Sequence, residues 1–182
     1  GKVKAIGLSN FHYKMLKSFG KELPKFSLNQ VPYNLLRRGY EGKTLKVCKS
    51  AGISYMAYSP LAQGLLAGVL NEEARKLIAR KDNRLYQEPY LTYALKFVKS
   101  LEKMAQETNK EPMELALAWV YAQENVSTVI VGTKTEDYIT IMAKAGDFDL
   151  SKELFDRLTS LSDSFPMVKK GRRNPPETID WC

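Results

Sequence analysis

Four short apolar segments, separated by stretches with helical periodicity, constrain the fold of this chain more than any other feature. They cover residues 3–7, 26–34, 53–61 and 127–133, and each is apolar on both of its faces. Strands of a parallel sheet show this pattern because the crossing helices between them bury both faces of the sheet. The alternation therefore predicts an α/β fold with a parallel sheet.

Apolar residues with a helical spacing lie between these segments and after the last one. The expected helices cover residues 12–22, 41–52, 91–104, 112–124, 135–146 and 151–163. Pro112 suits a first helical turn, and Ser151 is expected to cap the last helix. Residues 166–182, with two adjacent prolines and four basic residues, indicate an irregular tail. We therefore expect one domain over residues 1–165, followed by this tail.

Composition excludes several classes of protein. No apolar run approaches the ~20 residues of a membrane-spanning helix, and the first residues do not resemble a signal peptide. The two cysteines, Cys48 and Cys182, make no disulfide framework. Their number favours a reducing compartment, either the cytoplasm or the interior of an organelle such as the stroma or matrix. A single histidine and the lack of closely spaced cysteines argue against a zinc site.

Positive charge is concentrated in the first part of the chain. Residues 1–50 hold 11 Lys and Arg residues against 2 acidic residues, whereas the other 132 residues hold 17 against 18. A basic half can attract nucleic acid or a phosphorylated ligand. The lysines are spaced singly along the expected helices and turns, without interleaved aromatic residues. We therefore favour solvated surface charges over a nucleic-acid site.

Polar or glycine-containing loops follow all four expected strands, where ligands of parallel α/β folds bind. These loops contain Ser9, Asn10, Gln30, the segment from Tyr58 to Gly64, and the segment from Gly132 to Lys134. Each residue also has a purely structural interpretation. Asn10 can cap the next helix, and Gln30 can bond strand-end backbone. Tyr58 can be a half-buried aromatic at the rim of a barrel, and Lys134 can be a solvated lysine.

Five segments, in this order, resemble the aldo-keto reductase family. They read GKVKAIGLSNF, NQVPYNLLRR, AYSPLAQGLLAG, ELALAWV and TVIVGTKT. The third segment resembles most the branch that includes bacterial reductases and potassium-channel β subunits. The resemblance implies a TIM-type (β/α)8 barrel that reduces aldehydes and ketones with NADP(H). By the same resemblance, this chain holds strands five to eight of that barrel.

The resemblance also implies roles for the loop residues. It places Ser9, Asn10 and Gln30 at the nicotinamide carboxamide, which needs both donors and acceptors. Tyr58 matches the aromatic residue that stacks on the nicotinamide ring. The segment that crosses the pyrophosphate is matched by Ser59, Leu61, Gln63 and Gly64. The loop that receives the adenosine 2′-phosphate is matched by Gly132, Thr133 and Lys134.

This chain departs from the family in two respects. The family's catalytic Asp, Tyr, Lys and His belong to the first half of the barrel, so no catalytic residue is assigned here. His12 is not the catalytic histidine by its position. Tyr138, Ile141 and Met142 stand where the family has Arg or Gln, then Glu and Asn, for the adenosine end. Since Ile and Met cannot make those hydrogen bonds, we expect that end to bind differently or more weakly.

Half a barrel leaves two open sheet edges, which invite pairing or aggregation. We therefore expect this chain to need the missing N-terminal half, a second copy or another covering partner. The main hypothesis is an NADP(H)-dependent oxidoreductase of small carbonyl compounds, represented by its cofactor-binding C-terminal half. The alternative is a non-catalytic, reductase-like subunit with a structural or regulatory role in a larger complex.

Overall fold

The structure is a computed structural model that describes residues 1–68, 83–133 and 136–171. Its elements are, in chain order, β1 (Ile6–Ser9), α1 (Tyr13–Ser18), η1 (Gly20–Lys25), β2 (Phe26–Pro32), α2 (Lys43–Ser50), β3 (Ser54–Tyr58), η2 (Ala62–Ala67), η3 (Arg84–Tyr86), α5 (Tyr90–Glu107), α6 (Pro112–Tyr121), β4 (Val126–Ile130), α7 (Glu136–Asp147), α8 (Lys152–Ser164) and α9 (Pro166–Gly171). The η elements are short 3-10 helices.

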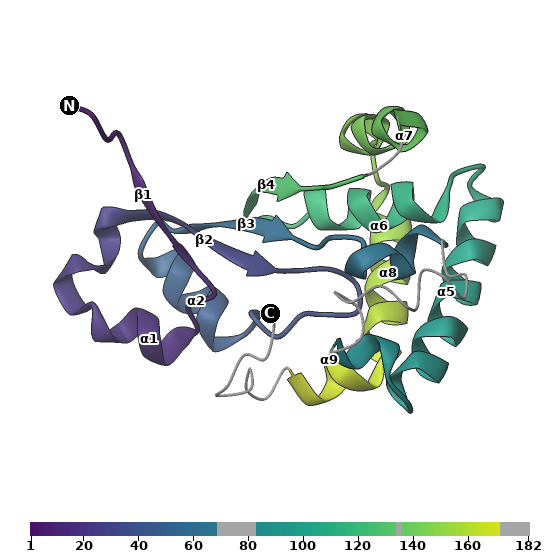
Figure 1. The fold of residues 1–182 in the computed structure, drawn as a ribbon, viewed down its shortest axis with the longest axis horizontal. Coiled ribbons are helices and arrows are strands. Elements are labelled where there is room, and N and C mark those ends of the chain that lie inside the picture. The colour runs from purple at the N-terminus through teal and green to yellow at the C-terminus, as the bar shows by residue number, and fades with distance from the viewer. Residues whose placement is uncertain (69–82, 134–135, 172–182) are drawn as a thin grey trace.

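The strands form one parallel sheet in the order β1-β2-β3-β4 (Figure 1). Sequential order with intervening helices is typical of a (β/α) barrel, whereas a doubly wound sheet reverses its strand order. The carboxyl ends of the strands are level, because Tyr58 pairs in register with Pro32 on one side and Ile130 on the other. The predicted α/β fold of the barrel type is therefore confirmed, and its strand ends converge on one rim.

The two faces of the sheet differ in burial. Along β3, Tyr55 and Ala57 are buried, whereas Met56 and Tyr58 are partly exposed. The buried face packs against α2, whose Cys48 lies close to the side chains of Asn29 and Tyr55. The partly exposed face is the one that lines the interior of a closed barrel. The residues that point into the barrel are therefore only half covered in the described part of the chain.

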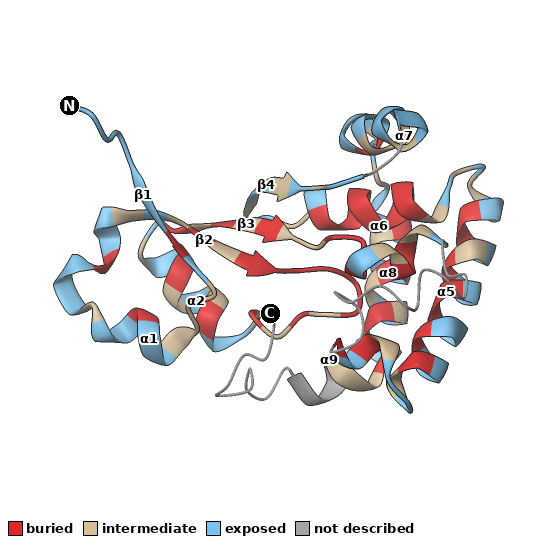
Figure 2. Cartoon of the chain, in the orientation of Figure 1, coloured by how far each residue is buried: buried red, intermediate tan, exposed pale blue. Residues whose placement is uncertain are grey.

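The main core lies between the chain after β2 and the helices α5, α6 and α8. Trp119 of α6 is fully buried and stacks on Tyr33, with ring centroids 5.6 Å apart, and on Phe155, at 6.3 Å. Its indole N–H donates to the hydroxyl of Thr159 at 2.9 Å. Figure 2 shows buried residues concentrated on β2, β3 and these helices, while the N-terminal segment, β4 and α7 are mostly exposed.

An ion cluster around the buried Arg38 ties the β2–α2 loop (residues 33–42) to α8. Arg38 is 7% exposed, and its Nε lies 2.6 Å from Glu41 Oε1 while its Nη1 lies 2.7 Å from Asp163 Oδ1. The hydroxyl of Ser162 donates to the backbone oxygen of Leu35 at 2.5 Å. The last long helix therefore fixes the loop that follows β2.

Several predicted features of the elements are confirmed, and others differ. Pro112 opens α6, and Ser151 caps α8 by accepting from the Leu154 N–H at 3.2 Å. The first strand is not residues 3–7 but Ile6–Ser9, because pairing with β2 begins only at Ile6. The helix expected over residues 12–22 ends early, since Gly20 adopts a φ of 53° and a 3-10 helix containing Pro24 follows.

The prediction of an irregular tail from residue 166 is wrong at its start. Helix α9 covers Pro166–Gly171, and Pro suits the first position of a helix. Val168 and the preceding Phe165 are buried in the core, which holds this short helix in place. Residues 172–182 lie outside the described residues.

Candidate functional site

The carboxyl ends of β1 and β2 bring Ser9, Asn10 and Gln30 together. Ser9 pairs in register with Gln30, and the Asn10 N–H donates to the Gln30 backbone oxygen at 2.8 Å. Asn10 has a φ of 63°, a left-handed conformation that Asn tolerates better than most residues. Two amide side chains and a hydroxyl thus lie at adjacent strand ends, as the resemblance implied.

Two tyrosines determine how Asn10 is held. The hydroxyl of Tyr58, at the end of β3, donates to Asn10 Oδ1 at 3.1 Å, although β2 lies between β1 and β3. The hydroxyl of Tyr40 donates to the Asn10 backbone oxygen at 3.2 Å. Burial, and then the nearby Tyr58, raise the pKa of Tyr40, so its hydroxyl remains a neutral donor at physiological pH. Both the backbone and the amide plane of Asn10 are therefore fixed.

The residue that caps the helix after β1 is His12, not Asn10. His12 Nδ1 accepts from the Lys14 N–H at 3.3 Å, so the interpretation of Asn10 as a helix cap is wrong. The fully buried Asn29 supports the same segment, because its Nδ2 donates to the Phe11 backbone oxygen at 2.7 Å. Asn29 is not among the site residues predicted from the sequence, although a polar residue within an apolar strand is a recognisable signal.

The segment after β3, residues 59–64, has an unusual backbone. Three of its non-glycine residues have positive φ angles, namely Ser59 at 51°, Ala62 at 50° and Gln63 at 58°, and Gly64 has a φ of 99°. Leu61 is buried, whereas Gln63 is exposed. Left-handed non-glycine residues are uncommon, and they cluster at sites where the surrounding structure imposes the conformation. The segment predicted to cross a pyrophosphate is thus the most strained stretch of described backbone.

Polar residues that the sequence analysis did not select hold this segment. Asn34 Nδ2 donates to the Ser59 backbone oxygen at 2.8 Å. Asn83 Nδ2 donates to Gln63 Oε1 at 2.7 Å, and Asn83 Oδ1 in turn accepts from the guanidinium of Arg37. Asn34 and Arg37 lie in the NLLRR segment quoted for the family resemblance. Their role depends on neighbours 25 and 46 residues away, which no local pattern reveals.

The β4 side of the site is exposed in its described residues. Gly132 and Thr133 follow β4 and are exposed, and the register of Ile130 with Tyr58 places them at the same rim as the other loops. Lys134, the predicted contact to a 2′-phosphate, lies outside the described residues.

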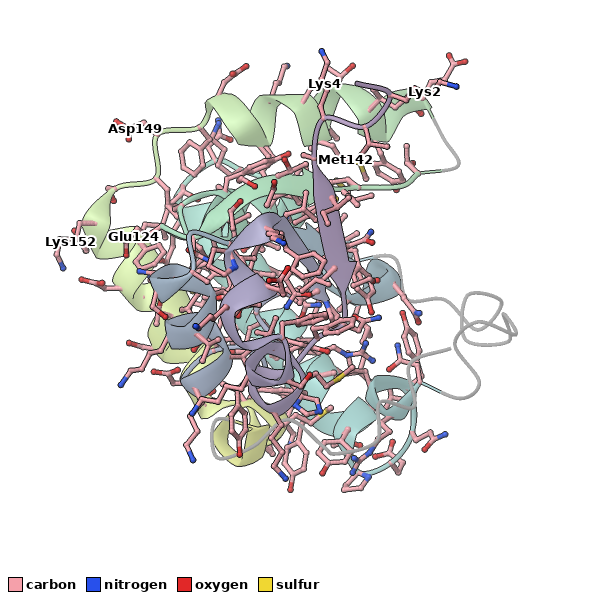
Figure 3. The ribbon with its side chains drawn as sticks, turned by 90° about the vertical axis from the view of Figure 1, so that its left-hand side faces the viewer. Lys2, Lys4, Glu124, Met142, Asp149 and Lys152 are labelled. Carbon is pink, nitrogen blue, oxygen red and sulfur yellow. The ribbon has the colours of Figure 1, made fainter. Side chains whose placement is uncertain are left out.

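Helix α7 presents packing residues where the family has polar ones. Tyr138, Ile141 and Met142 are partly buried and pack against the hydrophobic core. Figure 3 shows Met142 directed from α7 toward the sheet, while Lys2 and Lys4 lie on the extended N-terminal segment. These three side chains attach α7 to the rest of the chain. This packing role explains why apolar residues stand at positions where the family has polar ones.

Three further expectations from the sequence concern membrane spans, metal sites and Cys48. Within residues 1–68, 83–133 and 136–171, no helix is both long enough and apolar enough to cross a bilayer. In the same residues, His, Cys, Asp and Glu side chains nowhere gather in a group of three that could hold a metal ion. Cys48 is fully buried, in agreement with the small core residue that the sequence predicts.

Sequence comparisons agree with this geometry. The model of the aldo/keto reductase family matches residues 1–163. The aldo-keto reductase YhdN of Bacillus subtilis is 28% identical over 156 residues, which are 84% of this chain and 47% of that protein. The NADH-specific methylglyoxal reductase of Escherichia coli is 24% identical over 151 residues, 83% of this chain and 46% of that protein.

Structural comparison likewise matches this chain to about half of a longer protein. The glycerol dehydrogenase of Gluconobacter oxydans superposes with a TM-score of 0.76 at 24% identity, over 91% of this chain and 51% of that one. At this identity the likeness shows the fold alone, and the sheet corresponds to about half of a (β/α)8 barrel. The chain likewise spans about half the length of the relatives that it matches.

Proposed function

Since this chain belongs to the aldo/keto reductase family, we propose that it is the cofactor-binding C-terminal half of an NADP(H)-dependent oxidoreductase that acts on small carbonyl compounds. One observation carries the proposal most of all. Three consecutive strand ends place Asn10, Gln30 and Tyr58 on one rim, and hydrogen bonds join Asn10 to both of the others. That arrangement fits a flat aromatic ring with a neutral amide substituent.

The nicotinamide end fits these residues chemically. A carboxamide offers two N–H donors and one oxygen acceptor, and Asn and Gln side chains match both kinds of group. The ring of Tyr58 is partly exposed and is proposed to stack on the nicotinamide ring, and its bond to Asn10 fixes its direction. When bound, NADP(H) supplies a hydride, and the role of Tyr58 is to select which ring face is presented.

The segment from Ser59 to Gly64 is proposed to lie along the pyrophosphate. Gly64 carries no Cβ, so phosphate oxygens can approach the backbone closely at that point. Backbone N–H groups in alternating or left-handed conformations form concave anion sites. Ser59, Leu61, Gln63 and Gly64 therefore take the roles that the family resemblance gave them.

The choice between NADPH and NADH depends on the adenosine end. Gly132, Thr133 and Lys134 are proposed to surround the 2′-phosphate, with Lys134 as a positive charge. Tyr138, Ile141 and Met142, at the positions where the family has polar residues for that end, pack against the hydrophobic core instead. One of the relatives is named as NADH-specific, so NADH is the competing cofactor that an experiment has to compare.

The remainder of the barrel is proposed to supply the catalytic residues and to cover the open edges. Exposed apolar side chains lie on both edge strands, with Ile6 of β1 at 49% and Ile130 of β4 at 40% exposure. Four further parallel strands, from the same polypeptide or from another chain, would pair with these edges. No observation on the described residues favours the alternative of a purely structural subunit.

A binding titration tests the proposal. NADPH and NADH are titrated in parallel into the complete protein, and the emission of the bound reduced nucleotide is recorded. We expect Gln30→Ala to weaken binding about fivefold, because a typical hydrogen bond contributes about 1 kcal/mol. The matched control is Gln106→Ala, an exposed glutamine on α5 that should leave the affinity unchanged. If the wild-type protein binds neither nucleotide, the proposed function is wrong.

A further inference from the structure

The segment after β3 is strained and must be held from outside. Ser59, Ala62 and Gln63 have φ angles of 51°, 50° and 58°, and a left-handed non-glycine residue costs roughly 1–2 kcal/mol. Such conformations persist only where neighbouring contacts impose them. Two sets of contacts impose these conformations here. One comes directly from the β2–α2 loop, and the other comes from the residues around η3, which are bonded to the same loop.

The first support is Asn34, which is fully buried. Its Oδ1 accepts from the Leu36 N–H at 2.9 Å, which orients the amide so that Nδ2 donates to the Ser59 backbone oxygen at 2.8 Å. Reciprocal backbone hydrogen bonds of 3.0 and 3.1 Å between Asn34 and Arg37 close the turn in which both residues lie. Asn34 thus holds the beginning of the strained segment from one side.

The second support acts through Arg37. Its guanidinium donates to Asn83 Oδ1, and Asn83 Nδ2 donates to Gln63 Oε1 at 2.7 Å. Tyr86, three residues further on, donates its hydroxyl to the Gln63 backbone oxygen at 2.9 Å. Burial lowers the pKa of Arg37 to about 10, which still leaves the group charged at neutral pH. The end of the strained segment is therefore held from the η3 side.

We propose that Asn34 and Arg37 are positioning residues that set the backbone of residues 59–64 before a dinucleotide binds. Both belong to one tight turn, so a single element holds the two ends of the segment, directly at Ser59 and through Asn83 at Gln63. A loop ordered in advance does not lose further conformational entropy on binding, which raises the affinity. This inference rests on the proposed function, because it takes residues 59–64 to lie along the pyrophosphate.

Hydrogen exchange with mass spectrometry tests the positioning role without any ligand. In the complete protein, Asn34→Ala and Arg37→Ala should each raise amide exchange in residues 59–68 at least tenfold, while α8 keeps its protection. Arg157→Ala, which removes an exposed arginine on α8, is the matched control and should leave this segment unchanged. An unchanged exchange rate in residues 59–68, or an equal increase throughout the chain, would overturn the proposal.

Nucleotide affinity separates positioning from direct contact. We expect Arg37→Ala to weaken NADPH binding five- to tenfold, whereas Arg37→Lys and Arg37→Gln, which both keep a donor for Asn83, should retain most of the affinity. If Arg37→Gln loses affinity with normal exchange, the guanidinium contacts the phosphates itself and the positioning role is wrong. If wild-type protein binds no dinucleotide, the proposed function fails, and the exchange result alone decides whether the turn holds the segment.

Discussion

The two sides of the candidate site are built differently. After β1, β2 and β3, polar side chains bond to one another and to strained backbone, and the β2–α2 loop is tied to α8 by Arg38. After β4, Gly132 and Thr133 are exposed. Helix α7 is mostly exposed (Figure 2) and packs against the core through Tyr138, Ile141 and Met142. The side proposed to hold the nicotinamide and the pyrophosphate is thus organised within this chain, whereas the described residues of the side proposed for the adenosine are mostly exposed. The following predictions test that contrast, from the largest effect to the smallest.

Loss of Arg38 should disrupt the organised side most strongly. Arg38→Ala leaves Glu41 and Asp163 without their cation. Breaking a fully buried cluster costs roughly 3–5 kcal/mol, and the cost should lie below that range here because the Asp163 side chain is 41% exposed. Urea denaturation followed by circular dichroism measures the change in the free energy of unfolding. Lys152→Ala, which removes an exposed pair with Asp156, should cost less than about 1 kcal/mol. Equal effects of the two substitutions would contradict the contrast.

The second-largest effect should be a loss of stability at alkaline pH, caused by buried tyrosines of β3 and the β2–α2 loop. Burial raises the pKa values of Tyr33, Tyr40 and Tyr55 above that of an unfolded tyrosine, ~10. Their contribution to stability is complete below pH 10 and is lost as the pH rises above that value, by about 1.4 kcal/mol per pH unit for each group. Denaturation curves between pH 8 and pH 11 measure this slope. Tyr40→Phe removes one titrating group, so the slope of the unfolding free energy against pH should fall by the share of one group. An unchanged slope would argue against a buried Tyr40 hydroxyl.

Removal of a single hydroxyl from the rim should have a smaller effect. Tyr58→Phe keeps the aromatic ring but loses the bond to Asn10, worth about 1 kcal/mol, so NADPH affinity should fall about fivefold. Titration of NADPH into both proteins measures the difference. Tyr93→Phe, an exposed tyrosine on α5, serves as the control. Full affinity of Tyr58→Phe would show that Asn10 needs no side-chain partner.

A gain of function on the α7 side should be smallest. Tyr138→Arg supplies a charged donor at the position where the family has Arg or Gln. We expect NADPH affinity to rise two- to threefold, or about 0.5 kcal/mol, the usual size of a solvent-screened ion pair at a partly exposed position. Parallel titration with NADH is the control, because NADH lacks the 2′-phosphate. A similar gain for both nucleotides would place the new charge elsewhere on the cofactor.

The sequence predicts the architecture, because apolar segments separated by stretches of helical spacing suffice for the parallel sheet. Asn10, Gln30 and Tyr58 are selected through motifs that resemble the family, and the structure joins them by hydrogen bonds, while their contact with a cofactor stays a prediction. Asn34 and Arg37 could not be found in this way, since their partners depend on how the turn and the segment after β3 fold together. The start of β1 was misplaced for a similar reason, because pairing with β2, and not apolar character, sets its first residue.

The link between the β2–α2 loop and α8 also has a consequence for the order of events during translation. Arg38 and its partner Asp163 are separated by 125 residues. At a synthesis rate of ~5–20 residues per second, roughly 6–25 s pass between the two on the ribosome. During that interval the turn with Asn34 and Arg37 is already made, but its anchor is not. Slower translation between these positions should therefore lengthen the time during which the turn lacks its contact with α8.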